Sequence, residues 1–333
     1  MTDSDVAITP QIGPPVPFDP ELAAALEVIL PHMPNFTSVD AIPAIRARAG
    51  ELMVSRSNEE LSRDGAFHVE EILVPGVHGE QISLMVCRPT GIQAPSAAIY
   101  YIHGGGMIIG SNRMISDDML DWATEFDATL ISVDYRLAPE TPHPGPMEDC
   151  YAGLVWVADH AGELGIDPAR IVIAGESAGG GLAAATALLA RDRQGPAIAA
   201  QVLMCPMLDD RNDTPSAIQS EGRGVWHRHA NETGWSALLG AARGGPDVSP
   251  YAAPARATDL SGLPPALIDV GSAETFRDEA VTYASNIWRA GGQAELHVFA
   301  GGFHRYDGLA PQTTVSRDTK DVRVRWLRRI MNS

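Results

Sequence analysis

The sequence is short of cysteine, of positive charge and of long apolar runs, and each shortage excludes a class of protein. Its three cysteines, Cys87, Cys150 and Cys205, are too few and too scattered along 333 residues for a disulfide framework or a zinc site. A formal net charge of −18 argues against nucleic acid or an anionic membrane as a partner. No apolar run approaches the ~20 residues that span a bilayer.

The two ends of the sequence are polar. The acidic start has no basic stretch followed by an apolar one, so a secretory signal is not indicated and a cytoplasmic protein is expected. Near the other end, basic side chains predict the solvated face of a terminal helix, with Val324, Leu327 and Ile330 facing the core. These basic residues are Lys320, Arg323, Arg325, Arg328 and Arg329.

Strand and helix signals alternate along most of the chain. Val69–Val74 and Gln81–Arg88 flank a turn and predict a hairpin. Six later apolar runs predict strands at Ala97–Ile102, Thr129–Val133, Arg170–Ala174, Ala199–Met204, Pro265–Val270 and Glu295–Phe299. Helical stretches are expected near residues 114–125, 147–161, 178–191, 275–290 and 316–331. Since several strands are apolar on both faces, the pattern predicts a mostly parallel central sheet with helices on both sides.

Two segments stand outside this alternation. Residues 1–64 precede the first strand and contain two predicted helices, one capped by Asp19 and ending near Ile29, and one over Ala41–Arg56. Residues 207–262 hold no clear strand, and an insertion of that length after a strand indicates a functional lid. The chain therefore divides into an N-terminal helical part, 1–64, and a larger domain, 65–333, which carries an insertion near 207–262.

Two glycine-rich runs carry the strongest chemical signal. Gly175-Glu176-Ser177-Ala178-Gly179 follows an apolar strand and fits G-x-S-x-G, the sharp turn that exposes a nucleophilic serine. His103-Gly104-Gly105-Gly106 follows an earlier strand and fits the loop whose amides stabilise an oxyanion in lipases and esterases. Together they indicate acyl transfer, with Ser177 as nucleophile and the amides of Gly105, Gly106 and Ala178 as oxyanion donors.

A serine nucleophile needs a base and an acid that orients the base. In the α/β folds that carry a G-x-S-x-G turn, the order along the chain is serine, acid, histidine. His304 lies in a loop after the last predicted strand and is the candidate base. The acid is expected after Pro265–Val270, where Glu274 is favoured and Asp278 is the alternative, while Asp269 belongs to the strand itself.

Weaker signals concern ligands. Met107, Trp226, Trp235 and Phe303 are candidates for the substrate pocket, although helix packing explains the two tryptophans equally well. His227 and His229 have no carboxylate or cysteine at ligand spacing, so no metal is expected there. Residues 179–184 fit a dinucleotide fingerprint formally, but they begin inside a helix, so no dinucleotide is expected.

These motifs, together with residues 134–140 (DYRLAPE) and the segment 271–279, resemble the bacterial hormone-sensitive-lipase family (family IV) of α/β-hydrolase carboxylesterases, and most of all its brefeldin A esterase-like branch. The resemblance covers roughly residues 65–331. It implies the α/β-hydrolase fold, a helical cap built from the N-terminus and residues 207–262, no cofactor, and a possible homodimer. The family's nucleophile, acid and base fall on Ser177, Glu274 and His304. Two departures are Glu274, where the family commonly has aspartate, and Arg305, where it has glycine.

The motifs thus predict a serine carboxylesterase that acts through an acyl-enzyme, and the resemblance implies short- to medium-chain esters as its substrates. The leaving group is chosen by the geometry of the cap, so an amidase, peptidase or lactonase on the same scaffold is the alternative. A non-catalytic ligand receptor is a third hypothesis, and it is disfavoured because Ser177 and His304 are both present.

Overall fold

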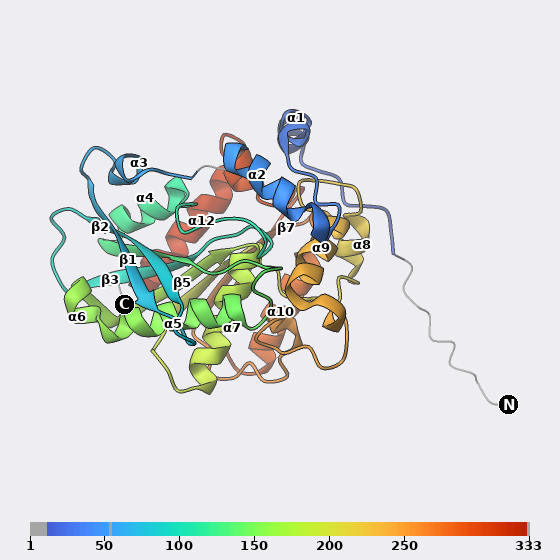
Figure 1. Ribbon diagram of the computed structural model, residues 1–333. Coiled ribbons are helices and arrows are strands. Elements are labelled where there is room, and N and C mark those ends of the chain that lie inside the picture. The colour runs from blue at the N-terminus through green and yellow to red at the C-terminus, as the bar shows by residue number, and fades with distance from the viewer. Residues whose placement is uncertain (1–11, 53–54, 332–333) are drawn as a thin grey trace.

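In the computed structural model, residues 12–52 and 55–331 are described, and within them eight strands form one sheet (Figure 1). The strand order is β1-β2-β4-β3-β5-β6-β7-β8. β1 pairs antiparallel with β2 and β2 with β4, whereas all other neighbours are parallel. The strands are β1 Phe67–Pro75, β2 Gln81–Pro89, β3 Ser96–Ile102, β4 Ala128–Asp134, β5 Ile166–Glu176, β6 Ala200–Met204, β7 Ala266–Gly271 and β8 Ala294–Phe299.

All eight predicted strands and all the predicted helices occur, with ends shifted by a few residues. The predicted helix over 41–56 is observed as Ile42–Leu52, and residues 53–54 lie outside the described part. The helices are α1 Pro20–Ile29, α2 Ile42–Leu52, α3 Asn58–Ser62, α4 Asp117–Glu125, α5 Gly145–Asp159, α6 Ala161–Leu164, α7 Ala178–Asp192, α8 Pro215–Gln219, α9 Arg228–Leu239, α10 Arg277–Arg289, α11 Tyr306–Leu309 and α12 Thr314–Met331.

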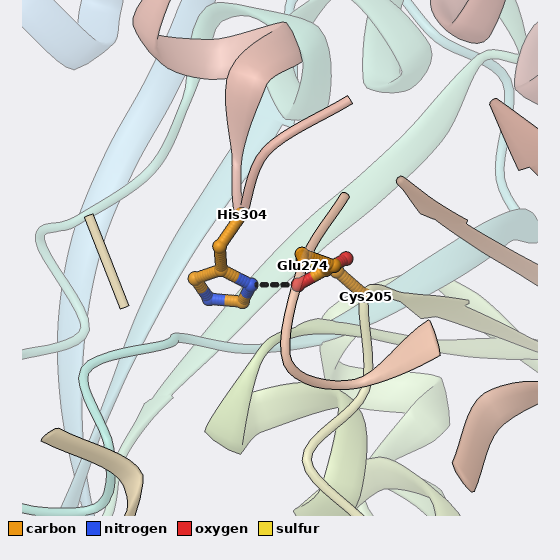
Figure 2. A group of neighbouring side chains, drawn as sticks. All are labelled: Cys205, Glu274 and His304. Atoms are coloured by element: carbon orange, nitrogen blue, oxygen red, sulfur yellow. Dashed lines mark hydrogen bonds and ion pairs between the residues drawn. The ribbon is translucent and has the colours of Figure 1, made fainter. Parts of the chain in front are cut away.

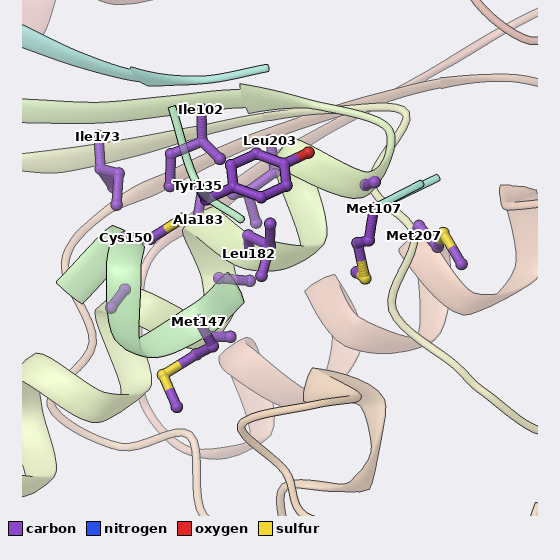
Figure 3. Packing of buried hydrophobic residues seen from close by; sticks show 14 of the residues in the cluster. Ile102, Met107, Tyr135, Met147, Cys150, Ile173, Leu182, Ala183, Leu203 and Met207 are labelled. Carbon is purple, nitrogen blue, oxygen red and sulfur yellow. The ribbon is translucent and has the colours of Figure 1, made fainter. Parts of the chain in front are cut away.

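The sheet buries both of its faces because alternate side chains of each central strand point in opposite directions. In β3, Tyr100 and Ile102 join a core with residues of α5, α7 and α10, whereas Ile99 and Tyr101 join a second core with α4 and α12. Figure 3 shows the first core, where Leu182 of α7 packs between strands and helices. The predicted α/β-hydrolase architecture, with helices on both faces, is confirmed.

The prediction for the terminal helix is wrong at one residue. Arg323 of α12 is not solvated but buried, and its guanidinium pairs with Asp269 of β7 at 2.6 Å and with Asp307 of α11 at 2.5 Å. A buried arginine is tolerated there because two carboxylates compensate its charge. Leu327 faces the core as predicted, and Val324 and Ile330 are partly buried against it.

The helices that the sequence placed outside the alternation gather at one end of the molecule, where α1, α2, α8 and α9 lie near one another (Figure 1). Asp19 caps α1 by accepting from the backbone amides of Glu21 and Leu22, as its position before Pro20 predicts. The side chain of Arg46 in α2 donates to the carbonyls of Ile108 and Ala138 on the main domain. None of the described helices is long and apolar enough to cross a bilayer.

Candidate active site

Parallel strands bring their carboxyl ends to one edge of the sheet, and the loops that follow them carry the predicted site residues. Ser177 follows β5, Glu274 follows β7 and His304 follows β8, while Gly105 and Gly106 follow β3. Since β5, β6, β7 and β8 are consecutive neighbours, segments more than a hundred residues apart in sequence meet above this edge.

Ser177 occupies a strained turn between β5 and α7. Its φ of +56° is unusual for a residue with a side chain, and its carbonyl accepts hydrogen bonds from the amides of Gly181 and Met207, which fix the turn. The flanking glycines are required by space: a Cβ on Gly179 would lie 2.0 Å from the carbonyl oxygen of Ile102. The G-x-S-x-G sequence therefore folds as the turn that its pattern predicts.

The side chains of Ser177, His304 and Glu274 form a continuous chain of hydrogen bonds. His304 Nε2 lies 2.9 Å from Ser177 Oγ, and His304 Nδ1 lies 2.5 Å from Glu274 Oε2, as Figure 2 shows for the second pair. All three residues are at most 4% exposed, so water does not compete for these bonds. This arrangement lets the imidazole accept a proton at Nε2 while the carboxylate holds a proton at Nδ1.

The alternative acids have other partners. Asp278 accepts from the backbone amide of Ser216 and pairs with Arg277, and Asp269 pairs with Arg323. Glu274 is held in the turn after β7 because its second oxygen accepts from the amide of Gly271 at 3.2 Å. Of the three acids considered from sequence, Glu274 is therefore the one that contacts the imidazole.

The imidazole is also fixed by aromatic packing. The ring of Phe276 meets His304 edge-on with centroids 5.0 Å apart. The hydroxyl oxygen Oγ1 of the neighbouring Thr275 lies 2.8 Å from the carbonyl oxygen of Trp226. This contact connects the loop that carries Glu274 to the 207–262 insertion. Packing of this kind limits the rotation of His304 and preserves its distance to Ser177.

The glycine-rich loop after β3 presents free amides. Within the described residues, the backbone N–H groups of Gly105, Gly106 and Ala178 donate no hydrogen bond to the protein. Gly106 has a φ of +62°, and a Cβ added there would lie 2.3 Å from the Trp226 ring, so only glycine fits. Ala178 begins α7, where the helix dipole adds to the attraction for an anion.

The four pocket candidates lie in different surroundings. Trp226 covers Gly106, and its ring centroid is 6.4 Å from that of His304. Met107 and Trp235 are fully buried in the core that Figure 3 shows in part, where Met107 is labelled. Phe303 is buried beneath α1 and meets Phe18 edge-on at 6.2 Å, which favours a packing role. Among these residues, the contacts bring Trp226 to the site.

His103, which opens the glycine-rich run, is buried and stacks on Tyr135 with ring centroids 4.2 Å apart. Its Nδ1 bonds the Gly104 carbonyl at 2.7 Å, whereas its Nε2 has no protein partner among the described residues. Burial lowers the pKa of His103 from 6.5 to about 4, opposed by the hydrogen bond to Gly104, so the imidazole is neutral at pH 7.

Sequence reasoning missed an ion pair between the residues adjacent to Ser177 and His304. Arg305 Nη2 lies 2.9 Å from Glu176 Oε1, which joins the residue after the histidine to the residue before the serine. Arg305 adopts a φ of +60°, where the related family has glycine. The departure from glycine at this position was visible in the sequence, but its partner 129 residues away was not.

It also missed the position of Cys205. This residue directly follows β6, the strand between those that lead to Ser177 and Glu274, and its φ is +38°. Its sulfur and the nearest ligand atoms of Glu274 and His304 all lie within 4.8 Å of one another. Burial, together with the charge of Glu274, raises the pKa of the Cys205 thiol well above its usual value, so the thiol is neutral.

Comparisons with known proteins identify the family of the chain. A family model described as alpha/beta hydrolase fold matches residues 99–307. The carboxylesterase NlhH of Mycobacterium tuberculosis is 34% identical over 299 residues, which are 87% of this chain and 90% of that protein.

Solved structures give the same result. A structure of a bacterial heroin esterase superimposes with a TM-score of 0.87 at 38% identity, and the match covers 95% of this chain and 98% of that one. Esterase LipW from Mycobacterium marinum matches with a TM-score of 0.80 at 31% identity, over 92% of this chain and 95% of that one. The chain therefore belongs to the α/β-hydrolase family. Within that family it belongs to the hormone-sensitive-lipase group of carboxylic ester hydrolases, as its motifs imply.

Proposed function

We propose that the protein is a serine carboxylesterase in which Ser177, His304 and Glu274 act as nucleophile, base and acid. One observation carries the proposal: the unbroken hydrogen-bond chain from Ser177 Oγ through the imidazole to Glu274, all of it buried. A serine hydroxyl is a weak nucleophile without such a base, and the base needs a fixed tautomer to receive the proton.

In the first half of the reaction, Ser177 Oγ attacks the ester carbonyl carbon while its proton passes to His304 Nε2. The tetrahedral oxyanion is bound by the amides of Gly105, Gly106 and Ala178, each of which is free to donate. Cleavage of the bond to the alcohol oxygen leaves the acyl group on Ser177, and the proton on Nε2 passes to the departing alkoxide.

In the second half, water replaces the alcohol. His304 removes a proton from the water, whose oxygen attacks the acyl carbon, and the carboxylic acid leaves as Ser177 regains its proton. Glu274 remains ionised and stabilises the imidazolium in both halves. The balance is ester plus water to acid plus alcohol, so the chemistry requires no cofactor.

Short to medium acyl groups are the proposed substrates because aromatic side chains closely cover the glycine-rich loop that carries Gly105 and Gly106, here called the oxyanion loop. Trp226 lies over Gly106, and Phe36 from the N-terminal part meets the Trp226 ring at 4.9 Å. We assign both segments, residues 1–64 and 207–262, to a cap over the site, with the exception of α3, which packs with β1 and α4 in the second core. Residues 1–11 and 53–54 lie outside the described part. Ser177 is 3% exposed, and we infer that movement of the cap admits the substrate.

Hydrolysis of p-nitrophenyl butyrate by the purified protein tests the proposal. We expect turnover that falls by at least ~10³-fold in Ser177→Ala, since the covalent path is then lost. The p-nitroanilide of the same acid serves as the comparison, and faster hydrolysis of the ester is expected. Full activity in Ser177→Ala, or a preference for the anilide, would overturn the assignment.

A further inference from the structure

A thiol that the mechanism does not use lies beside the catalytic acid and base. Cys205, Glu274 and His304 come from three loops that follow β6, β7 and β8, and Figure 2 shows them grouped together. Their ligand atoms lie within 4.8 Å of one another, and all three residues are buried. No other three His, Cys, Asp or Glu side chains in the described part of the chain offer ligand atoms this close.

We propose that this group is an inhibitory site for a borderline-soft divalent cation, Zn²⁺, bound by Cys205 Sγ, His304 Nδ1 and a Glu274 carboxylate oxygen. The proposal rests on the proposed function, because inhibition follows from the role of His304. Sulfur, imidazole nitrogen and carboxylate oxygen are together the ligand types that zinc prefers, and the thiolate excludes Mg²⁺ and Ca²⁺, which take oxygen ligands.

The three ligand atoms lie within reach of a tetrahedral site, although they are not yet arranged as one. Zinc bonds of ~2.0 to 2.3 Å place neighbouring ligand atoms roughly 3.5 Å apart. His304 Nδ1 and Glu274 Oε2, now 2.5 Å apart, must therefore separate by about 1 Å, and the Cys205 sulfur, within 4.8 Å of both, must approach by up to about 1 Å. Rotation of the Cys205 and Glu274 side chains supplies these movements while the His304 ring stays in place. The fourth position remains for water. Two negative ligands, the thiolate and the carboxylate, neutralise the ion in a buried place.

Binding moves protons as follows. The Cys205 thiol releases its proton to solvent and binds as thiolate. The proton on His304 Nδ1 moves to Nε2, so that the Nδ1 lone pair binds the metal and the hydrogen bond to Glu274 is replaced. Nε2, which faces Ser177 Oγ at 2.9 Å, now carries a hydrogen and cannot accept the serine proton. The bound metal thus prevents His304 from acting as a base, and it does not contact the oxyanion loop.

The position of Cys205 is fixed by its backbone. Its amide donates to the carbonyl of Asp269 at 2.7 Å, and its φ of +38° is one that a residue with a side chain seldom adopts. The other two cysteines have no such neighbours: Cys87 lies within β2 and Cys150 within α5, both buried in the hydrophobic cores. They provide matched controls.

The experiment uses two readouts on the full-length protein. Co²⁺, a spectroscopic substitute for Zn²⁺, is added to the wild type, Cys205→Ala and Cys87→Ala, and the thiolate-to-cobalt charge-transfer band is recorded. In parallel, hydrolysis of p-nitrophenyl butyrate is measured after incubation with Zn²⁺. We expect the band in the wild type and in Cys87→Ala but not in Cys205→Ala. The Zn²⁺ concentration for half inhibition should rise at least ~10-fold in Cys205→Ala alone.

The readouts separate the possible failures. Hydrolysis without metal shows that Cys205→Ala is folded. Absence of the charge-transfer band in the wild type, or equal inhibition of the wild type and Cys205→Ala, would overturn the metal site and leave the esterase assignment intact. If the protein hydrolysed no ester, the cobalt band would still decide whether the site exists.

Discussion

Single side chains decide the chemistry, and Glu274 is the one whose assignment the sequence left open. Its carboxylate contacts His304 Nδ1 at 2.5 Å, while Asp278 is engaged by Ser216 and Arg277. We therefore expect Glu274→Gln to lower kcat by ~10³-fold or more, because an amide no longer stabilises the imidazolium. Asp278→Asn should stay within about threefold of the wild type. Steady-state kinetics on p-nitrophenyl butyrate measure both, and the reverse order would reassign the acid.

The buried imidazole of His103 gives a second prediction at this scale, on stability. Its folded pKa of about 4 lies below the unfolded value of 6.5, so the unfolded state takes up a proton first as pH falls. The stability that its neutral form confers is complete above pH 6.5 and is lost progressively as pH falls to about 4. Between pH 7.5 and 5 this amounts to about 2 kcal/mol.

Urea unfolding of the wild type and of His103→Gln at both pH values measures this effect. The free energy of unfolding should fall more steeply with acidification in the wild type than in His103→Gln, since glutamine does not titrate. Parallel pH dependences in the two proteins would show that His103 does not remain neutral in the folded state.

The residue scale also shows where sequence reasoning ends. Ser177 and His304 could be singled out because a local motif and the order of catalytic residues mark them. The pairs Glu176–Arg305 and Cys205–Glu274 carry no such mark, since their contacts exist only after β5, β6, β7 and β8 are placed side by side. Strand order cannot be read from apolar periodicity alone.

At the scale of elements, strands and helices were predictable because each has a periodic apolar pattern. The terminal helix shows the limit of the method: its basic residues indicate solvent, yet Arg323 is buried. Nothing local to α12 reveals the carboxylates of Asp269 and Asp307, which make that burial possible.

Removal of the buried positive charge of Arg323 should therefore lower the stability of the protein. We expect Arg323→Met to lower the free energy of unfolding by about 3 to 5 kcal/mol, because it leaves the Asp269 carboxylate uncompensated in the core. Arg328→Met on the same helix is the control. Arg328 pairs with Glu125 at the surface, so its loss should cost less than about 1 kcal/mol. Denaturant unfolding compares the two, and equal costs would contradict this view of the ion pairs.

At the scale of the whole molecule, the proposed cover over the site is made from two distant parts of the chain. Phe36 belongs to the N-terminal part and Trp226 to the insertion, and their rings meet next to the oxyanion loop. The length of the insertion indicates such a cover, but it does not predict which residues of the cover contact the site. The contact between Trp226 and Gly106 depends on tertiary packing.

This contact should set the acyl-chain limit. Phe36→Ala removes a ring that is 3% exposed and frees space beside Trp226, so we expect the kcat/KM ratio of octanoate to butyrate esters to rise ~10-fold. Phe18→Ala is the matched control, since Phe18 packs on Phe303 beneath α1. A p-nitrophenyl ester series gives the ratio. An unchanged ratio in Phe36→Ala, or an equal rise in Phe18→Ala, would show that the contact between Phe36 and Trp226 does not set the acyl-chain limit.

Covalent labelling tests the central claim, the activation of Ser177 by His304, most directly. The protein is treated with a fluorophosphonate, digested, and analysed by mass spectrometry. The predicted result is one phosphonyl group per chain on the peptide containing Ser177, and a labelling rate at least ~10³-fold lower in His304→Ala. Labelling at another residue, or an unchanged rate in a folded His304→Ala, would contradict the account.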